Sequence, residues 1–95
     1  MIPLLLALAI QAEAGNYYVE LNWIQSPTPG ITGNCVYRAK AGAVLKKLAC
    51  VEPPILRYKD TRVKDGETYS YAVTAVEGEE ESPYSDAITV KIPDN

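Results

Sequence analysis

The sequence contains no histidine and no phenylalanine, and it has only two cysteines and one tryptophan among its 95 residues. Without histidine, a Ser-His-Asp triad is excluded, and two cysteines alone do not complete a structural zinc site. A C-x-x-C pair and a glycine-rich phosphate loop are also missing, which argues against dithiol redox chemistry and phosphate binding. We therefore predict no catalytic residues, no metal site and no cofactor.

The composition is that of one small globular domain. Hydrophobic residues make up 47% of the chain, and seven prolines and six glycines supply many turns, as expected of an all-β protein. The net charge is −3, which disfavours binding to nucleic acid.

The segment 69–76 shows the clearest periodicity in the chain. Tyr69, Tyr71, Val73 and Ala75 fall on one face of an extended strand, and the residues between them fall on the other. A strand with one apolar face belongs to an antiparallel sheet. The pattern predicts a β-sandwich.

A second strand, Tyr18–Ile24, alternates in the same way. It places Val19, Leu21 and Trp23 toward the core. The remaining segments expected to be strands are 10–14, 31–39, 45–51, 55–63 and 87–92. Together they give about seven strands separated by turn signals, as in an immunoglobulin-like sandwich.

The apolar run Ile2–Ile10 is too short to span a bilayer as a helix, which takes about 20 residues. Three interpretations remain open. The run is part of a signal peptide cleaved at Ala12-Glu13-Ala14, or it leads into a first strand at 10–14 with Ile10, Ala12 and Ala14 inward, or it packs on a neighbouring subunit. We accordingly divide the chain into an apolar segment, 1–9, and a domain, 10–95.

Five short motifs occur in an order that resembles a known family. They are Val19-x-Leu21-x-Trp23, then Pro29-Gly30-Ile31-Thr32-Gly33 with Val36-Tyr37-Arg38, then Tyr58-x-Asp60-Thr61-x-Val63, then Gly66-x-Thr68-Tyr69-x-Tyr71-x-Val73-Thr74-Ala75-Val76, and Glu81-Ser82-Pro83-Tyr84-Ser85. Over residues 10–93 the chain resembles a fibronectin type III domain of bacterial secreted proteins. One departure is Asn34, which stands where the family usually has an inward tyrosine.

The resemblance implies a seven-stranded antiparallel sandwich with a central tryptophan. It also implies a tyrosine corner, in which the Tyr69 hydroxyl bonds backbone near Val63–Asp65. The core residues expected from the pattern and the resemblance are Val19, Leu21, Trp23, Val36, Tyr69, Tyr71, Val73 and Ala75.

The two cysteines are either a disulfide or two unpaired thiols. If the chain turns at Gly42-Ala43, as in a type II′ hairpin, Cys35 faces Cys50 and Tyr37 faces Leu48. Opposed Cβ atoms lie about 4.5–5.5 Å apart, near disulfide reach. We predict the Cys35–Cys50 disulfide.

The resemblance implies a non-enzymatic binding or spacing module, extracellular or at a cell surface, that contacts protein or polysaccharide. Its alternative is a structural subunit of a filament, virion or surface layer, assembled as a homo-oligomer through residues 1–10. No membrane span is expected. The residues expected to form the binding surface are Tyr37, Leu48, Glu79, Glu80, Glu81 and Tyr84.

Overall fold

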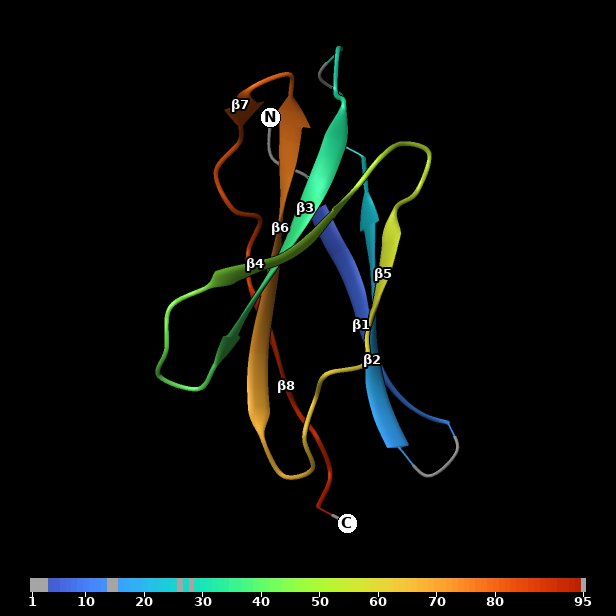
Figure 1. Cartoon of the computed structure of the whole chain (residues 1–95), viewed down its shortest axis with the longest axis vertical. Helices are drawn as coiled ribbons and strands as arrows, with labels where there is room; N and C mark the ends of the chain where they lie inside the picture. Colours follow the sequence, from blue (N-terminus) through green and yellow to red (C-terminus); the bar gives the residue numbers. More distant parts are fainter. Residues whose placement is uncertain (1–3, 14–15, 26, 28, 95) are drawn as a thin grey trace.

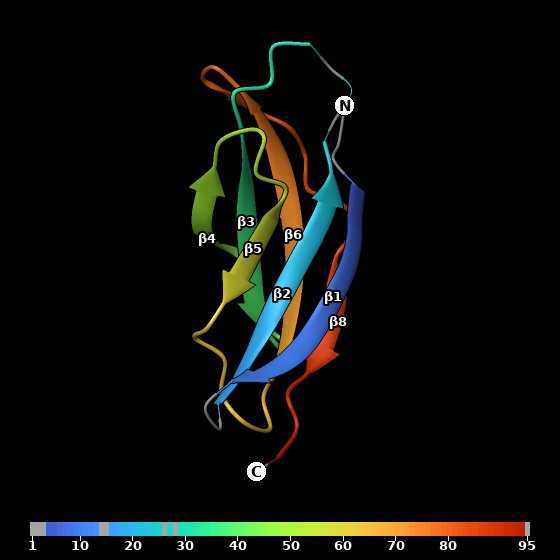
Figure 2. The same ribbon diagram turned by 90° about the vertical axis from the view of Figure 1, so that its right-hand side faces the viewer.

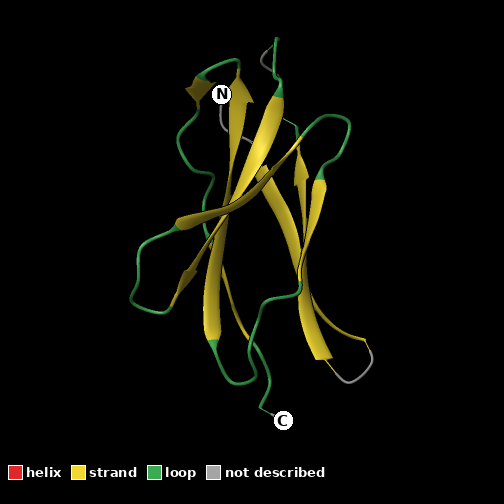
Figure 3. Ribbon diagram, in the orientation of Figure 1, coloured by secondary structure: helices red, strands yellow, loops and turns green. Residues whose placement is uncertain are grey.

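The computed structural model describes residues 4–13, 16–25, 27 and 29–94, and of residues 4–9 and 13 it describes the backbone alone. The described residues form strands and loops without a helix (Figure 3). The strands are β1 (Leu4–Glu13), β2 (Asn16–Ile24), β3 (Gly33–Lys40), β4 (Lys46–Val51), β5 (Arg57–Asp60), β6 (Thr68–Glu77), β7 (Glu80–Glu81) and β8 (Ile88–Lys91).

The strands form two antiparallel sheets that pack face to face (Figure 1). One sheet has the order β1-β2-β5, and the other has the order β4-β3-β6-β7 with β8 also paired to β6. In Figure 2 the β1-β2-β5 sheet faces the viewer and the other sheet lies behind it, and β1 contacts β8. The predicted immunoglobulin-like sandwich is confirmed, with one additional short strand, β7, where a loop was expected.

The first strand begins earlier than predicted, at Leu4 rather than at residue 10. It therefore crosses the boundary placed between segments 1–9 and 10–95. Its prediction as an inward-facing strand was also wrong in part: Ile10 lies opposite buried Val19 but is 37% exposed, and Ala12 is exposed. The reason is that β1 is the edge strand of its sheet, with β2 as its only neighbouring strand there, so its side chains are less covered than those of β2. Ala14, the last residue of the predicted cleavage site, lies outside the described residues.

The core lies between the sheets and contains the residues expected from the alternation. All eight predicted core side chains are buried, from fully buried Val19, Leu21, Val36, Tyr71 and Val73 to Ala75 at 4% exposed. Ile92 joins this cluster. At Asn34, which is fully buried, the side-chain Nδ2 donates to the Thr74 carbonyl at 3.2 Å, so a polar bond takes the place of an aromatic ring.

The tyrosine corner forms within the expected segment. The backbone N–H of Lys64 donates to the Tyr69 hydroxyl at 3.0 Å. This bond ties the loop before β6 to the strand itself, and Tyr69 is 1% exposed. The guanidinium of Arg38 lies over the Tyr69 ring, with the Arg38 Cζ 5.1 Å from the ring centroid.

A charged network crosses the sandwich between the sheets. The Asp60 carboxylate, at the end of β5, accepts hydrogen bonds from Arg38 Nη1 at 2.9 and 3.2 Å, from the Tyr71 hydroxyl at 2.6 Å and from the Arg62 backbone N–H at 3.1 Å. Asp60 is 1% exposed, so its charge is compensated almost entirely by these donors.

The same network shifts two pKa values. Burial and the hydrogen bond to Asp60 raise the pKa of Tyr71 far above its usual value. Burial by itself lowers the pKa of Arg38, but the hydrogen bond and the negative charge of Asp60 outweigh it and raise that pKa. The arginine therefore stays charged inside the sandwich.

The hairpin between β3 and β4 differs from the prediction in its register. Cys35 pairs with Cys50 as expected, but a β-bulge follows Val36, so Tyr37 lies opposite Lys47 rather than Leu48. The turn is also displaced by one residue: the Ala43 N–H donates to the Lys40 carbonyl, which makes Gly42 (φ +80°) the second central residue. The bulge shifts the register by one residue between the cysteine pair and the Arg38–Lys46 pair.

Candidate functional site

The Ser82–Ser85 segment is held against β6 by paired hydrogen bonds. Ser82 accepts from the Ala75 N–H through Oγ at 2.9 Å and donates its own N–H to the Ala75 carbonyl at 2.8 Å. Ser85 does the same with Val73, at 3.0 and 2.8 Å. The two serines thus replace a regular strand partner, and they fix the position of Tyr84 between them.

Tyr84 belongs to a group of five side chains on the outer face of the five-stranded sheet, which we call the tyrosine cluster. Its ring meets the Tyr37 ring edge-on, with centroids 4.9 Å apart. Glu81 accepts hydrogen bonds from the Tyr37 hydroxyl and from Thr74 Oγ1, the latter at 2.7 Å. Lys47 Nζ lies 3.6 Å from Glu81 Oε1 and 5.8 Å from the Tyr37 ring centroid.

Glu81 is therefore the polar centre of the tyrosine cluster. The hydrogen bond from Tyr37 lowers the pKa of Glu81, with further contributions from Thr74 and Lys47. Burial and the hydrogen bond to Glu81 raise the pKa of Tyr37 to about 12. Tyr37 is only 9% exposed, whereas Tyr84 is 47% exposed, so Tyr84 presents the accessible ring and Tyr37 supports it.

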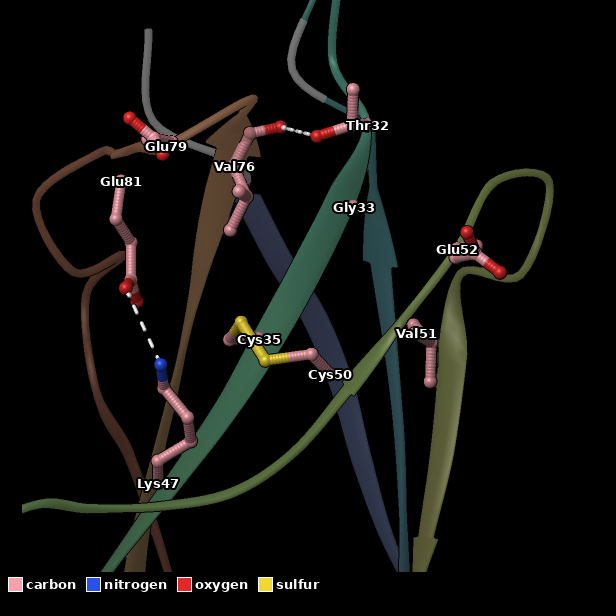
Figure 4. A pocket seen from close by; sticks show the side chains of 10 residues that line it. All are labelled: Thr32, Gly33, Cys35, Lys47, Cys50, Val51, Glu52, Val76, Glu79 and Glu81. Atoms are coloured by element: carbon pink, nitrogen blue, oxygen red, sulfur yellow. Dashed lines mark hydrogen bonds and ion pairs between the residues drawn. A yellow bond between two sulfur atoms is a disulfide. The ribbon is translucent and has the colours of Figure 1, made fainter.

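A groove of about 370 Å³ continues from the tyrosine cluster toward the β6–β7 turn (Figure 4). We call it the disulfide groove, because the Cys35–Cys50 bridge, with an S–S distance of 2.04 Å, is part of its floor. The predicted disulfide is thus confirmed. The residues that line the groove are Thr32, Gly33, Cys35, Lys47, Cys50, Val51, Glu52, Val76, Glu79 and Glu81.

Four of the residues expected at the binding surface lie in this region. Tyr37, Glu81 and Tyr84 are in the tyrosine cluster, and Glu79 is at the disulfide groove. Glu80 is exposed in β7 and pairs with Glu77, outside both features.

The placement of Leu48 on the outer face beside Tyr37 was wrong. Leu48 is half-buried and packs against the hydrophobic core, because the bulge changes which face of β4 its side chain occupies. Sequence reasoning also missed Lys47 and Thr74, although Thr74 was correctly placed on the face opposite Tyr71. The available signal was the alternation in β6, which puts Thr74 on the same face as Tyr37 across the ladder.

The described residues hold no group of three or more His, Cys, Asp or Glu side chains that could bind a metal ion. They also contain no helix that is long and apolar enough to cross a membrane. What the site offers chemically is an exposed aromatic ring, a mixed polar and apolar groove, and carboxylates that accept hydrogen bonds.

Known structures share this architecture. An Fn3-like protein from Clostridium thermocellum is 25% identical, with a TM-score of 0.72 and coverage of 100% of this chain and 95% of that chain. The chain is a fibronectin type III-like domain. No protein-family model matches its sequence, and no curated protein matches it.

The same fibronectin type III-like domain matches parts of larger enzymes. A β-1,2-glucanase from Parabacteroides distasonis is 28% identical, with a TM-score of 0.72 and coverage of 98% of this chain. The pectate lyase PelI from Erwinia chrysanthemi, in complex with tetragalacturonic acid, is 20% identical with a TM-score of 0.76 and coverage of 93%. The domain spans 14% of the glucanase and 28% of the lyase.

Proposed function

We propose that this fibronectin type III-like domain is a non-catalytic binding module that acts outside the cytoplasm and contacts polysaccharide or protein at a cell surface. The single observation that carries the proposal is the exposed Tyr84 ring, fixed by Ser82 and Ser85 and supported edge-on by Tyr37. An exposed aromatic side chain held in one orientation loses little entropy on binding, so it is suited to a contact surface.

The location outside the cytoplasm is supported by the Cys35–Cys50 disulfide. Disulfides persist in oxidising compartments and are rare in the cytosol. The domain is similar to one part of a glucanase and to one part of a pectate lyase. This likeness supports a role for the domain in binding polysaccharide, next to a separate catalytic part of such chains.

The alternative role as a filament, virion or surface-layer subunit is less well supported. It depends on residues 1–10 being free to assemble with another subunit. From Leu4 onward, these residues form β1 and pair with β2 in the domain's own sheet. Their backbone hydrogen bonds are therefore used in part within the domain.

The proposal is tested by measuring retention of the purified domain on intact bacterial cells and on insoluble cell-wall material. We expect Tyr84→Ala to weaken retention at least about tenfold, as is typical for removal of a central aromatic contact. Tyr84 is 47% exposed, so the substitution should leave the fold intact. Tyr18→Ala is the matched control, because half-buried Tyr18 lies in the other sheet. Equal retention of the Tyr84→Ala variant and the parent domain would refute the proposal.

A further inference from the structure

We infer that the ligand of the tyrosine cluster and the disulfide groove is an uncharged glycan. The inference rests on the proposed function and narrows it to one ligand class. The two features form one continuous surface, because Glu81 and Lys47 belong to both. A ligand on Tyr84 can therefore extend into the groove without leaving the outer face of the sheet.

The charges of the groove exclude an acidic polymer. Three carboxylates line it, those of Glu52, Glu79 and Glu81, against the single ammonium of Lys47. Lys47 is already paired with Glu81 at 3.6 Å. Within the described part of the chain, the side chains of Glu52 and Glu79 have neither a hydrogen bond nor an ion pair. A polymer with a carboxylate on each sugar would meet these charges without a compensating cation.

The same groups match the chemistry of a neutral sugar. A pyranose ring has an apolar C–H face, which can lie on the exposed Tyr84 ring, and hydroxyl groups around its edge. Ionised carboxylates such as those of Glu52 and Glu79 are strong acceptors for hydroxyl donors. The groove floor is apolar where the disulfide, Val51 and Val76 line it, and its volume of about 370 Å³ is in the range of small-molecule sites.

A basic protein segment fits the surface less well. A lysine or arginine of a partner would bind over an aromatic ring and beside a carboxylate. Lys47 of the domain itself already occupies that place. Lys47 Nζ lies 5.8 Å from the Tyr37 centroid and 3.6 Å from Glu81. A second cation there would meet the charge of Lys47.

The experiment titrates the full domain with three probes and follows binding by calorimetry and by amide chemical shifts. The probes are a linear β-1,2-linked gluco-oligosaccharide, tetragalacturonate and a tetralysine peptide. We expect the neutral oligosaccharide to bind at least about tenfold more tightly than tetragalacturonate at low salt. The difference should shrink as salt shortens the Debye length from about 30 Å at 0.01 M to about 10 Å at 0.1 M.

The double variant Glu52→Gln/Glu79→Gln tests the charge directly. Glutamine keeps the size and an acceptor oxygen but removes the charge. We expect the affinity for the neutral oligosaccharide to fall about three- to tenfold, because an amide oxygen is a weaker acceptor than a carboxylate, and the affinity for tetragalacturonate to rise at least about tenfold. The matched control is Glu20→Gln/Glu67→Gln, whose side chains do not line the groove and should change neither value.

The outcomes separate this inference from the proposed function. Tetragalacturonate binding that equals or exceeds neutral-sugar binding, or a tetralysine peptide that binds through Glu52 and Glu79, overturns the inference. If no oligosaccharide binds but Tyr84 is still required for retention on cells, the inference fails and the proposed function stands. If Tyr84→Ala has no effect in either assay, both fail.

Discussion

Replacing Arg38 with methionine should destabilise the domain strongly, because it leaves the Asp60 carboxylate buried without its countercharge. Asp60 is 1% exposed, and Arg38 Nη1 donates to both of its oxygens, at 2.9 and 3.2 Å. Methionine keeps much of the side-chain volume, so the change removes the charge and the donors more than it removes packing.

The magnitude follows from the burial of the two partners. Breaking a fully buried ion pair by removing one partner costs about 3–5 kcal/mol. The Arg38 side chain is 20% exposed, and the Asp60 side chain is 2% exposed. Water therefore screens part of the loss, and we expect roughly 2–4 kcal/mol. For a domain of this size, each kcal/mol lowers the melting temperature by about 4–8 °C, so the midpoint should fall by roughly 10–30 °C.

The assay is urea unfolding followed by the fluorescence of Trp23, the only tryptophan, which is 3% exposed in the folded state. The slope of the free energy of unfolding against urea should be unchanged, because the surface exposed on unfolding is nearly the same. Arg57→Met is the matched control: Arg57 is exposed, and its side chain has no hydrogen bond or ion pair within the described residues. Its effect should stay within about 0.5 kcal/mol.

A second substitution distinguishes an uncompensated charge from lost packing. Adding Asp60→Asn to Arg38→Met removes the carboxylate that lacks a partner, so the double variant should be more stable than Arg38→Met alone. The reasoning is refuted if Arg38→Met costs less than about 1 kcal/mol, or if the effects of the two substitutions simply add.

Four further predictions concern other parts of the domain. Trp23→Ala should lower the free energy of unfolding, measured by circular dichroism, by about 3–5 kcal/mol. A loss under about 1 kcal/mol would contradict the place of Trp23 in the core. Because the pKa of Tyr37 is raised to about 12, its protonated form should contribute fully to the free energy of unfolding below pH 10, and this contribution should fall as the pH rises toward 12. Tyr37→Phe should reduce that fall. The pKa of Glu81 is lowered, so its ionised form stabilises the folded state above the usual glutamate pKa, and this stabilisation should be lost as the pH falls below that pKa. Urea unfolding at a series of pH values should show that Glu81→Gln removes this part of the acid dependence of stability. Thiol titration of unfolded, non-reduced protein should find no free cysteine, and reduction of Cys35–Cys50 should cost about 2–4 kcal/mol in urea unfolding.

Most of the fold could be predicted from local patterns. Strict alternation identified the inward residues of β2 and β6, because successive side chains of a strand point to opposite faces whatever the strand pairs with. The cysteine pair could be predicted because a hairpin brings residues near in sequence into register. The start of β1 could not, since the apolar run 2–10 has no alternation to mark where pairing begins.

The outer face of β6 shows where the alternation stopped being informative. Ala72 and Thr74 were expected on the face away from the core, yet both are buried. Tyr37 lies opposite Ala72 in the β3–β6 ladder, and Glu81 accepts a hydrogen bond from Thr74. Binary patterning predicts which side of a strand faces the main core, but it does not predict what covers the other side.

The sequence by itself determined the period-2 strands and the disulfide partner, because each depends on residue type and short spacing. The central tryptophan and the tyrosine corner were expected from the resemblance to fibronectin type III domains. Only the tertiary structure decided that Arg38 meets Asp60 across the two sheets, that Leu48 turns to the core at a bulge, and that two serines hold Tyr84 beside Tyr37. The Arg38–Asp60 and Tyr37–Tyr84 contacts join segments that are distant in sequence. Their geometry follows from how the sheets pack and where a register shifts by one residue, which no local pattern encodes.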